Sequence, residues 1–160
     1  MDREFRLLFV CLGNICRSPA AEGVMRAFVH ENDLASHVQI DSAGTAGWHS
    51  GKRADERMRA AALTRGYDLA SRARQLTAED LRSFDLVLVM DRENLRDALA
   101  LDPESRYADK VKLFCDFCTD HTEHQVPDPY YGGPEGFEKV LDLLEDGCRN
   151  LITHVKASRA

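Results

Sequence analysis

The sequence predicts an α/β fold with three layers (αβα), in which helices cover both faces of a central parallel sheet of four strands. Apolar segments of strand length alternate with segments whose apolar residues recur at helical spacing, and no repeat, linker or low-complexity stretch interrupts this alternation. In such folds the crossovers are right-handed, and ligands bind at the carboxyl ends of the strands. The chain has 160 residues, so residues 1–160 are expected to form a single domain.

The start of the chain predicts a strand, a helix and a second strand. Residues 6–11 form an almost continuously apolar run, as in a strand that is buried on both faces. The next helix should have Ser18 as its N-cap and Pro19 at its first position, where a missing N–H costs nothing. Its apolar residues recur at helical spacing as far as Val29, and residues 37–41 predict the second strand.

The middle of the chain predicts a loop and two helices. Residues 42–51 have the composition of a loop, and residues 54–65 predict a helix that Gly66 closes. A short helix is expected to start at Thr77, because Thr77 and Asp80 have the spacing of a capping box.

The remaining elements are two strands and two helices. Residues 84–90 give the clearest central strand, and Asp91 can cap a helix that runs through Leu101. A weaker strand is expected at residues 111–114. The long C-terminal helix should bury one apolar face. That face consists of Phe137, Val140, Leu141, Leu144, Cys148, Leu151, Ile152 and Val155.

Composition and charge exclude several classes of protein. The chain is 44% hydrophobic and 30% charged, as globular proteins are, and its formal charge of -6 argues against nucleic acid as a partner. No apolar run has the length of a membrane span, and the first residues do not resemble a signal peptide. We therefore expect a cytoplasmic protein without membrane insertion, whose five cysteines are thiols.

The charge is distributed unevenly along the chain. Residues 52–74 carry seven basic and three acidic side chains, whereas residues 116–146 carry nine acidic side chains and one basic. These segments are either two solvated faces or, for the basic one, a rim that attracts an anionic substrate.

The segment from Cys11 to Ser18, CLGNICRS, lies between the first strand and its helix, where α/β proteins bind anions. Its backbone N–H groups can converge on one tetrahedral anion, Gly13 allows a tight bend, and Arg17 can hold two phosphate oxygens. Beneath that anion, a Cys11 thiolate would be an in-line nucleophile. The expected phosphate-binding residues are Leu12, Gly13, Asn14, Ile15, Cys16, Arg17 and Ser18. No Walker A loop is present, because Gly47 and Gly51 enclose only three residues.

A second chemical element is Asp128, which stands between two prolines in a stiff loop. Breaking a phosphate ester requires an acid to protonate the leaving oxygen and then a base to activate water, and one carboxyl group can do both. Tyr130 and Tyr131 could form apolar walls for a flat aromatic leaving group.

These segments, together with Ser42-Ala-Gly-Thr45, resemble the low-molecular-weight protein tyrosine phosphatase family over nearly the whole chain. The resemblance implies a hydrolase that removes phosphate from a phosphotyrosine-containing protein or a small aryl phosphate. It implies that Cys11 forms a phosphocysteine, that Arg17 clamps the phosphate and that Asp128 is the general acid and base. No cofactor and no metal are expected, and the chain should be a monomer or associate weakly.

The resemblance also assigns supporting roles, which are implied by the family and not by spacing. Asn14, Ser18 and Ser42 resemble the polar residues that hold the loop, and Trp48 resembles a wall residue that lines the cleft with Tyr130 and Tyr131. Cys16 resembles a second loop cysteine that forms a reversible disulfide with the oxidised nucleophile. Many relatives have a histidine where this chain has Ser71, so the support of the loop is expected to be weaker here.

Three alternatives remain open. A thiol-dependent arsenate reductase shares this fold and loop but needs further cysteines to relay a disulfide, and only Cys115 and Cys118 are candidates near the third strand and beyond. A non-catalytic phosphoprotein-binding module would keep Arg17 but need neither Cys11 nor Asp128. A metal site is the third alternative, because Cys115, Cys118, His121 and His124 have ligand chemistry, although their spacing is too short for a structural zinc site.

Overall fold

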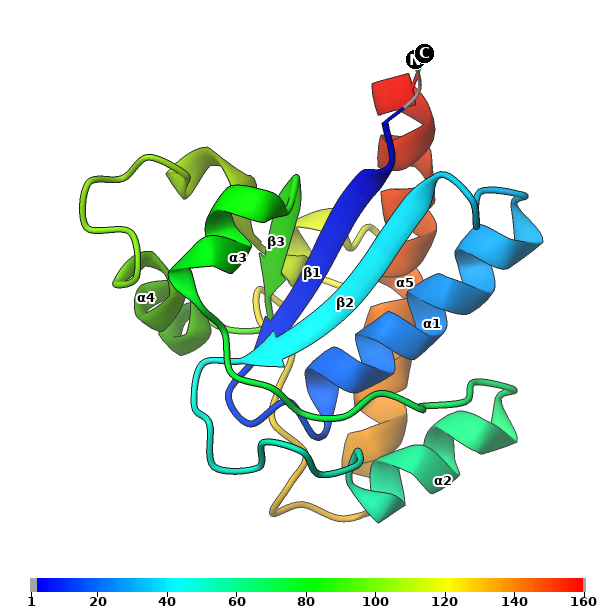
Figure 1. Ribbon diagram of the computed structural model, residues 1–160. Helices are drawn as coiled ribbons and strands as arrows, with labels where there is room; N and C mark the ends of the chain where they lie inside the picture. The colour runs from blue at the N-terminus through cyan, green and yellow to red at the C-terminus, as the bar shows by residue number, and fades with distance from the viewer. Residues whose placement is uncertain (1–2, 160) are drawn as a thin grey trace.

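A parallel sheet forms the middle layer of the molecule, with strand order β2-β1-β3-β4 (Figure 1). The computed structural model describes residues 3–159. The strands are β1 (Phe5–Cys11), β2 (Val38–Gly44), β3 (Leu86–Val89) and β4 (Val111–Leu113). The predicted three-layer α/β fold is therefore confirmed, and its two central strands, β1 and β3, are the two that read as continuous apolar runs.

Helices cover both faces of this sheet (Figure 1). They are α1 (Arg17–Glu31), α2 (Glu56–Thr64), α3 (Ala78–Ser83), α4 (Arg92–Leu99) and α5 (Pro134–Arg159), with two short 3₁₀ helices, η1 (Ala108–Lys110) and η2 (Phe114–Phe117). None of the helices within residues 3–159 is long and apolar enough to span a membrane.

Alternate side chains of β1 point into two separate cores. Leu7, Phe9 and Cys11 belong to the core that the sheet forms with α1, α2 and α5. Leu8 and Val10 belong to the smaller core that the sheet forms with α3 and α4. Because side chains alternate along a strand, the residue that ends β1 is fixed from both sides of the sheet.

Helix ends mostly follow the predicted signals. Thr77 and Asp80 form the expected capping box of α3, and the Asp91 side chain accepts the Asn94 N–H at the start of α4. Gly66 follows α2 with a φ of 90°, in the left-handed region that glycine adopts at low cost. The start of α2 lies two residues after the predicted one, because Asp55 is its cap.

Two predictions about local structure are wrong. Helix α1 begins at Arg17, one residue before the expected cap Ser18, which lies inside the helix and uses its hydroxyl elsewhere. Residues 42–44, which were expected in a loop, extend β2 because they continue its parallel pairing until Gly44 lies opposite Cys11. Smaller differences also occur at element ends. Helix α4 stops at Leu99, residue 114 starts η2, and β3 covers only Leu86–Val89 of the predicted residues 84–90.

Asp146, on α5, holds the segment that follows η2. Its carboxylate is buried and accepts the backbone N–H groups of Thr119, Asp120 and His121, each at 3.0 Å. The His121 ring also bonds it through Nδ1 at 2.8 Å. Burial raises the pKa of Asp146, but the Thr119 N–H, the His121 ring and the other N–H groups outweigh burial and hold this pKa below its ordinary value.

Replacing Asp146 by Asn should destabilise the protein by about 2–4 kcal/mol at pH 7, because an amide donates where the backbone also donates. A carboxylate with a lowered pKa stabilises the fold above its unfolded-state pKa of about 3.9, and this contribution disappears as the pH falls through the folded-state value. The difference between wild type and Asp146→Asn should therefore shrink below about pH 4. Urea unfolding at several pH values measures it. Asp97→Asn, at an exposed position of α4, is the control, and a pH-independent difference would contradict the role of the charge.

Candidate active site

The loop after β1 curls around the sulfur of Cys11. Cys11 is buried, and its Sγ accepts the backbone N–H of Asn14 at 3.3 Å. The bend is made at Asn14, whose φ of 56° lies in the left-handed region that asparagine tolerates better than most residues. Gly13 does not adopt a positive φ, so its predicted role is wrong in detail. A Cβ at this position would lie 2.9 Å from the ring of His49, which would have to shift.

Asn14 also supports the loop through its side chain. Its Nδ2 donates to Ser18 Oγ at 2.7 Å and to Ser42 Oγ at 3.0 Å, while its Oδ1 accepts the backbone N–H of Arg74 at 3.0 Å. The structure thus brings together the three predicted support residues. Ser71 is not among the partners of Asn14 within residues 3–159, and the backbone of Arg74 supplies the third bond instead. The substitution at position 71 therefore leaves both amide hydrogens and the oxygen of Asn14 paired.

The Ser18 hydroxyl is directed at Cys11. Its Oγ lies 3.0 Å from Cys11 Sγ and 3.5 Å from the carbonyl oxygen of Ala43. The Ser18 Oγ accepts from Asn14, and its single hydroxyl hydrogen can turn to the sulfur or to this carbonyl oxygen. The Cys11 sulfur therefore meets both the Asn14 N–H and the Ser18 hydroxyl.

A buried carboxylate ends the chain of hydrogen bonds behind the loop. Ser42 Oγ donates to Glu22 Oε1 at 2.6 Å, and Arg26 donates to Glu22 Oε2 at 2.8 Å. Glu22 is only 4% exposed. Polar bonds therefore run without interruption from Glu22 through Ser42, Asn14 and Ser18 to the nucleophile. Sequence reasoning did not find Glu22, because a single glutamate in an amphipathic helix is normally solvated.

Arg17 is held from two segments distant in the sequence. Its Nη1 donates to Asp91 Oδ2 at 2.6 Å and to the carbonyl of Val126 at 3.1 Å, and its Nη2 lies 3.7 Å from Asp128 Oδ2. Burial lowers the pKa of Arg17, but the Cys11 sulfur and the Asp91 carboxylate outweigh burial, and this pKa is raised. The guanidinium is thus a permanent cation beside the sulfur. The sequence predicted Asp91 only as a helix cap, and it does not reveal Val126 at all.

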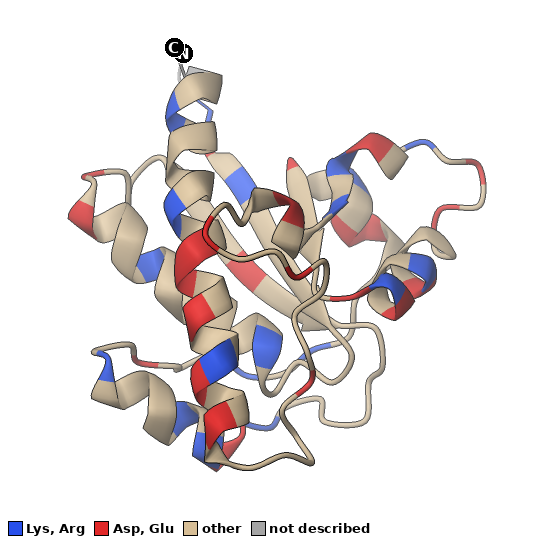
Figure 2. Cartoon of the chain, turned by 180° about the vertical axis from the view of Figure 1, so that it is seen from behind, with Lys and Arg blue, Asp and Glu red and all other residues tan. Residues whose placement is uncertain are grey.

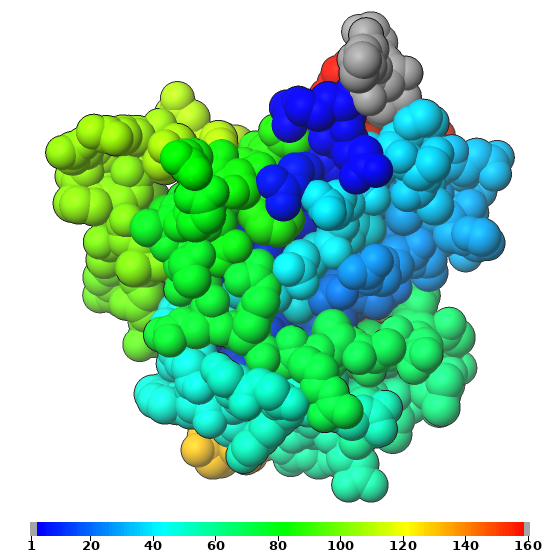
Figure 3. All heavy atoms as spheres, in the orientation of Figure 1, coloured from blue at the N-terminus to red at the C-terminus, as the bar shows by residue number. Residues whose placement is uncertain are grey.

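A cavity of about 210 Å³ opens above the loop, at the carboxyl end of the sheet. Its predicted members are Cys11, Leu12, Gly13, Ile15, Cys16, Arg17, Trp48, Asp128, Tyr130 and Tyr131. His49, which the sequence did not single out, also lines the cavity. The space-filling view shows the loop of residues 45–51 (cyan) along this end of the molecule, with the segment near residue 130 (gold) projecting below it (Figure 3).

Aromatic side chains form the outer walls of this cavity. Trp48 is 72% exposed and Tyr131 is 96% exposed, so both stand at the rim. Tyr130 meets Tyr131 edge to face, with ring centroids 4.9 Å apart, and the guanidinium of Arg57 lies over its ring at 5.2 Å. A deep polar floor and apolar walls suit a phosphate that is attached to a flat ring.

Asp128 stands on the wall beside Arg17. Its Oδ1 accepts the backbone N–H of Tyr130 at 3.1 Å, as in an Asx turn, and its Oδ2 is the oxygen that faces Arg17. Its side chain is 44% exposed. A carboxyl group in this position can reach the leaving oxygen of a bound ester and also a water molecule.

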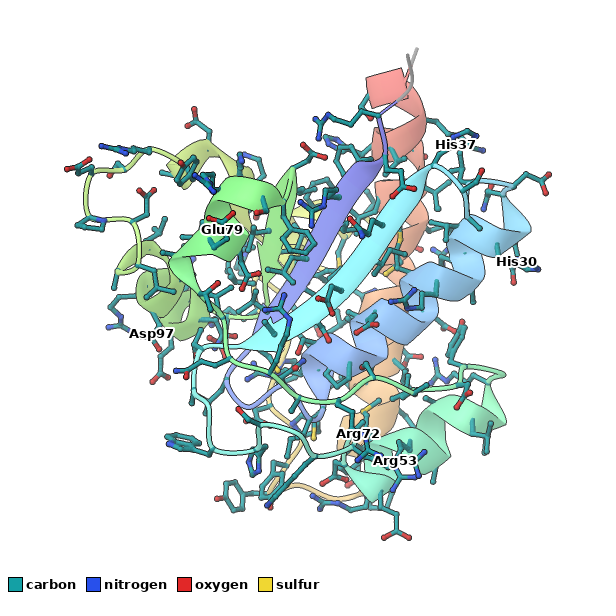
Figure 4. All side chains as sticks on the ribbon, in the orientation of Figure 1. His30, His37, Arg53, Arg72, Glu79 and Asp97 are labelled. Atoms are coloured by element: carbon teal, nitrogen blue, oxygen red, sulfur yellow. The ribbon has the colours of Figure 1, made fainter. Side chains whose placement is uncertain are left out.

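Ion pairs join the basic segment, residues 52–74, to the acidic segment, residues 116–146. Arg65, from the basic segment, binds Glu138, Asp142 and Glu145 of α5 at 2.7–3.0 Å, and Figure 2 shows acidic residues along this helix. Arg53 and Arg72 instead lie opposite each other in an isolated antiparallel bridge, close to α2 (Figure 4). Like charges in such positions repel, so this pair could attract an anion.

The candidate metal ligands do not form a site. Among residues 3–159, no group of three or more histidine, cysteine, aspartate or glutamate side chains could hold a metal ion. His121 binds Asp146, and His124 is exposed.

Known proteins share this arrangement. The family model described as "Low molecular weight phosphotyrosine protein phosphatase" matches residues 6–160. A Synechocystis sp. protein assigned to the low molecular weight protein-tyrosine-phosphatases is 52% identical over 148 residues, which are 92% of this chain and 94% of that protein. A protein tyrosine phosphatase from Entamoeba histolytica, solved with Hepes in its active site, superposes with a TM-score of 0.94 at 44% identity, over 98% of this chain and 100% of the other.

A structure of lower sequence identity and a human relative also match nearly the whole chain. YfkJ from Bacillus subtilis superposes with a TM-score of 0.92 at 33% identity and covers 99% of this chain and 98% of its own. The human low molecular weight phosphotyrosine protein phosphatase is 37% identical over 149 residues, 91% of this chain and 92% of its own. A match that spans the whole sheet, the loop and the acid segment, in sequence and in structure alike, settles which group of enzymes this is: the chain belongs to the low molecular weight phosphotyrosine protein phosphatase family.

Proposed function

We propose that the chain hydrolyses phosphotyrosine and small aryl phosphates through a phosphocysteine on Cys11. The observation that carries the proposal is the placement of the Cys11 sulfur beneath a cavity that Arg17 and Asp128 also line. The family match favours hydrolysis over the two other functions considered, arsenate reduction and phosphoprotein binding without catalysis.

The reaction has two steps. In the first, the Cys11 thiolate attacks phosphorus, the bond to the phenolic oxygen breaks, and Asp128 gives its proton to that oxygen. In the second, Asp128 takes a proton from water, the resulting hydroxide attacks the phosphocysteine, and inorganic phosphate leaves while the thiolate returns. Arg17 and the loop N–H groups hold the equatorial oxygens throughout, where negative charge is spread in the transition state.

Asp128→Asn should reveal the general acid. The amide keeps the oxygen that accepts the Tyr130 N–H but cannot transfer a proton, so kcat for phosphotyrosine peptides should fall about 10²–10³-fold. The loss should be smaller for p-nitrophenyl phosphate, whose leaving oxygen needs less protonation. Steady-state kinetics in EDTA from pH 4 to 9 measure both substrates, and the variant should lack the alkaline decline of wild type. Asp120→Asn is the control. Equal losses with both substrates and an unchanged pH profile would assign Asp128 to the turn alone.

We also propose that Cys16 protects the nucleophile from oxidation. Cys16 is 4% exposed and lies in the same cavity wall as Cys11. Burial, with the nearby carboxylate of Asp55 and the Cys11 sulfur, raises the pKa of Cys16, so it stays a thiol while Cys11 reacts. Hydrogen peroxide would convert the Cys11 thiolate to a sulfenic acid, and the Cys16 thiol would then displace water from it to form a disulfide.

The test compares recovery after peroxide treatment. Wild type should regain most of its activity with dithiothreitol, whereas Cys16→Ala should lose it irreversibly as Cys11 passes to sulfinic acid. Cys148→Ala, a buried thiol outside the site, is the control. Equal recovery of wild type and Cys16→Ala would disprove protection by Cys16.

We place the enzyme in the cytoplasm, because Cys11 and Cys16 must be kept as thiols for the reaction. All five cysteines are free, which supports this assignment. We further propose that the enzyme acts as a monomer, since a single chain supplies the nucleophile, the clamp, the acid and the walls of the cleft.

A further inference from the structure

We propose that Cys115 and Cys118 form a second reversible disulfide, at a modification site separate from the catalytic loop. Cys115 lies within η2, and Cys118 is the residue that caps it. Neither residue lines the cavity above Cys11 or takes part in the hydrolysis of the ester.

The backbone already holds the two cysteines at disulfide distance. The N–H of Cys118 donates to the carbonyl oxygen of Cys115 at 3.0 Å and closes one 3₁₀ turn. Residues three apart in such a turn have eclipsed side chains, and their Cα atoms lie within about 7 Å of each other. Disulfides join Cα atoms that are about 4.4–6.8 Å apart. The turn therefore needs little change to accept the bond.

The two thiols are chemically unequal. A hydrogen bond from the Cys118 thiol lowers the pKa of Cys115 below its ordinary value, although burial acts in the opposite direction. The same hydrogen bond, together with burial, raises the pKa of Cys118 far above its ordinary value. Cys118 can also donate to the carbonyl oxygen of Leu143, at 3.5 Å. One sulfur is thus prepared to react, and the other remains a thiol next to it.

The surroundings keep this pair in place. Phe114, before the pair, packs on Phe9 with ring centroids 6.1 Å apart, and a Cβ at Gly147 would lie 2.4 Å from its ring. After the pair, the backbone of Thr119 is held by the carboxylate of Asp146. Because both flanks are fixed, the chain does not have to lose conformational freedom when the bond forms.

Exposure separates this pair from the remaining cysteine of the core. Cys148 is fully buried, and its Sγ donates to the carbonyl oxygen of Ala21 at 4.0 Å. Cys115 is 7% exposed, and Cys118 is half-buried. A small oxidant can therefore reach the pair from the side of Cys118.

The chemistry balances with hydrogen peroxide as the oxidant. The Cys115 thiolate attacks one peroxide oxygen, the O–O bond breaks, and a sulfenic acid and hydroxide form. The proton that Cys115 released on ionising converts this hydroxide to the first water. The Cys118 sulfur then attacks the sulfenyl sulfur, its proton joins the departing hydroxyl, and the second water leaves. Two sulfurs lose two electrons in total, and a dithiol such as dithiothreitol returns them by exchange.

Peptide mapping of the whole protein tests the proposal without interference from the catalytic loop. Cleavage after Lys112 and Lys139 releases residues 113–139, which contain Cys115 and Cys118 and no other cysteine. After peroxide treatment and alkylation with iodoacetamide, this peptide should be lighter by two hydrogen atoms and unalkylated. After dithiothreitol it should carry two alkyl groups. In protein unfolded with urea, the same oxidation should be at least about tenfold slower, because the turn is lost.

Two variants complete the test. In Cys118→Ser, peroxide should leave Cys115 as a sulfenic acid that dimedone traps. In wild type, dimedone should label nothing at this position. Cys148→Ser should behave as wild type. The proposal is overturned if residues 113–139 stay doubly alkylated while Cys11 is oxidised, or if folded and unfolded protein oxidise this pair at the same rate. The wild-type comparison decides the matter even if a variant does not fold.

Discussion

Replacing Cys11 by Ser should lower kcat for p-nitrophenyl phosphate by at least about 10⁴-fold. The loop stabilises an anion at this position through the Asn14 N–H, the Ser18 hydroxyl and the charge of Arg17. A serine hydroxyl loses its proton at far higher pH than a thiol, so the same surroundings do not make it a nucleophile at neutral pH. The C–O bond of serine is also shorter than the C–S bond of cysteine, so the oxygen lies farther from the phosphorus.

The assay is hydrolysis in EDTA, with binding of inorganic phosphate as the second measurement. Binding should be retained in Cys11→Ser, because Arg17 and the loop N–H groups are untouched, which distinguishes a lost nucleophile from a misfolded loop. Cys118→Ser, the same substitution outside the site, should keep wild-type kinetics. Activity of Cys11→Ser within tenfold of wild type, or activity that depends on added metal, would refute the thiolate mechanism.

Arg17→Lys should lower kcat/KM by about 10³-fold or more, because a point charge replaces a planar fork at a bidentate site. The guanidinium uses Nη1 for Asp91 and Val126, and this leaves Nη2 oriented toward the cavity and Asp128. A lysine cannot bind Asp91 and two phosphate oxygens together. It also leaves the Val126 carbonyl oxygen without its donor, so we expect a loss of about 1–3 kcal/mol in the free energy of unfolding.

Arg17→Lys should weaken both catalysis and the binding of inorganic phosphate, whereas Cys11→Ser should weaken catalysis alone. Arg149→Lys, at an exposed position on α5, serves as the matched control. Asp91→Asn should weaken the enzyme less, because the Val126 carbonyl still orients Nη1. If kcat/KM of Arg17→Lys falls less than tenfold, the loop N–H groups bind the phosphate without the guanidinium.

Local signals were enough to predict the architecture. Apolar runs gave β1 and β3, and the caps at Thr77 and Asp91 marked two helix starts, because each depends on residues that are neighbours in the chain. The position of the loop between β1 and α1 gave the site for the same reason.

The missed features all depend on contacts between distant segments. Asp91 and Val126 lie 74 and 109 residues from Arg17, and Glu22 meets Ser42 across 20 residues. Residues 42–44 have a loop-like composition, and only pairing with β1 makes them a strand. Ser18 is a good cap by type, but a buried sulfur competes for its hydroxyl. Such competition is decided by the tertiary structure, so the local sequence does not reveal it.

The two hydrogen bonds of the Val126 backbone link the phosphate-binding residue to the general acid. The N–H of Val126 donates to the carbonyl of Met90, the residue after β3, and its own carbonyl accepts from Arg17, two residues before Asp128. Val126 therefore connects the guanidinium that binds the phosphate to the segment that carries the general acid. By reciprocity, a ligand that draws Arg17 toward itself also sets the position of the acid, and a displaced acid loosens the grip. We therefore expect phosphate binding by Arg17 and proton transfer by Asp128 to depend on each other through Val126.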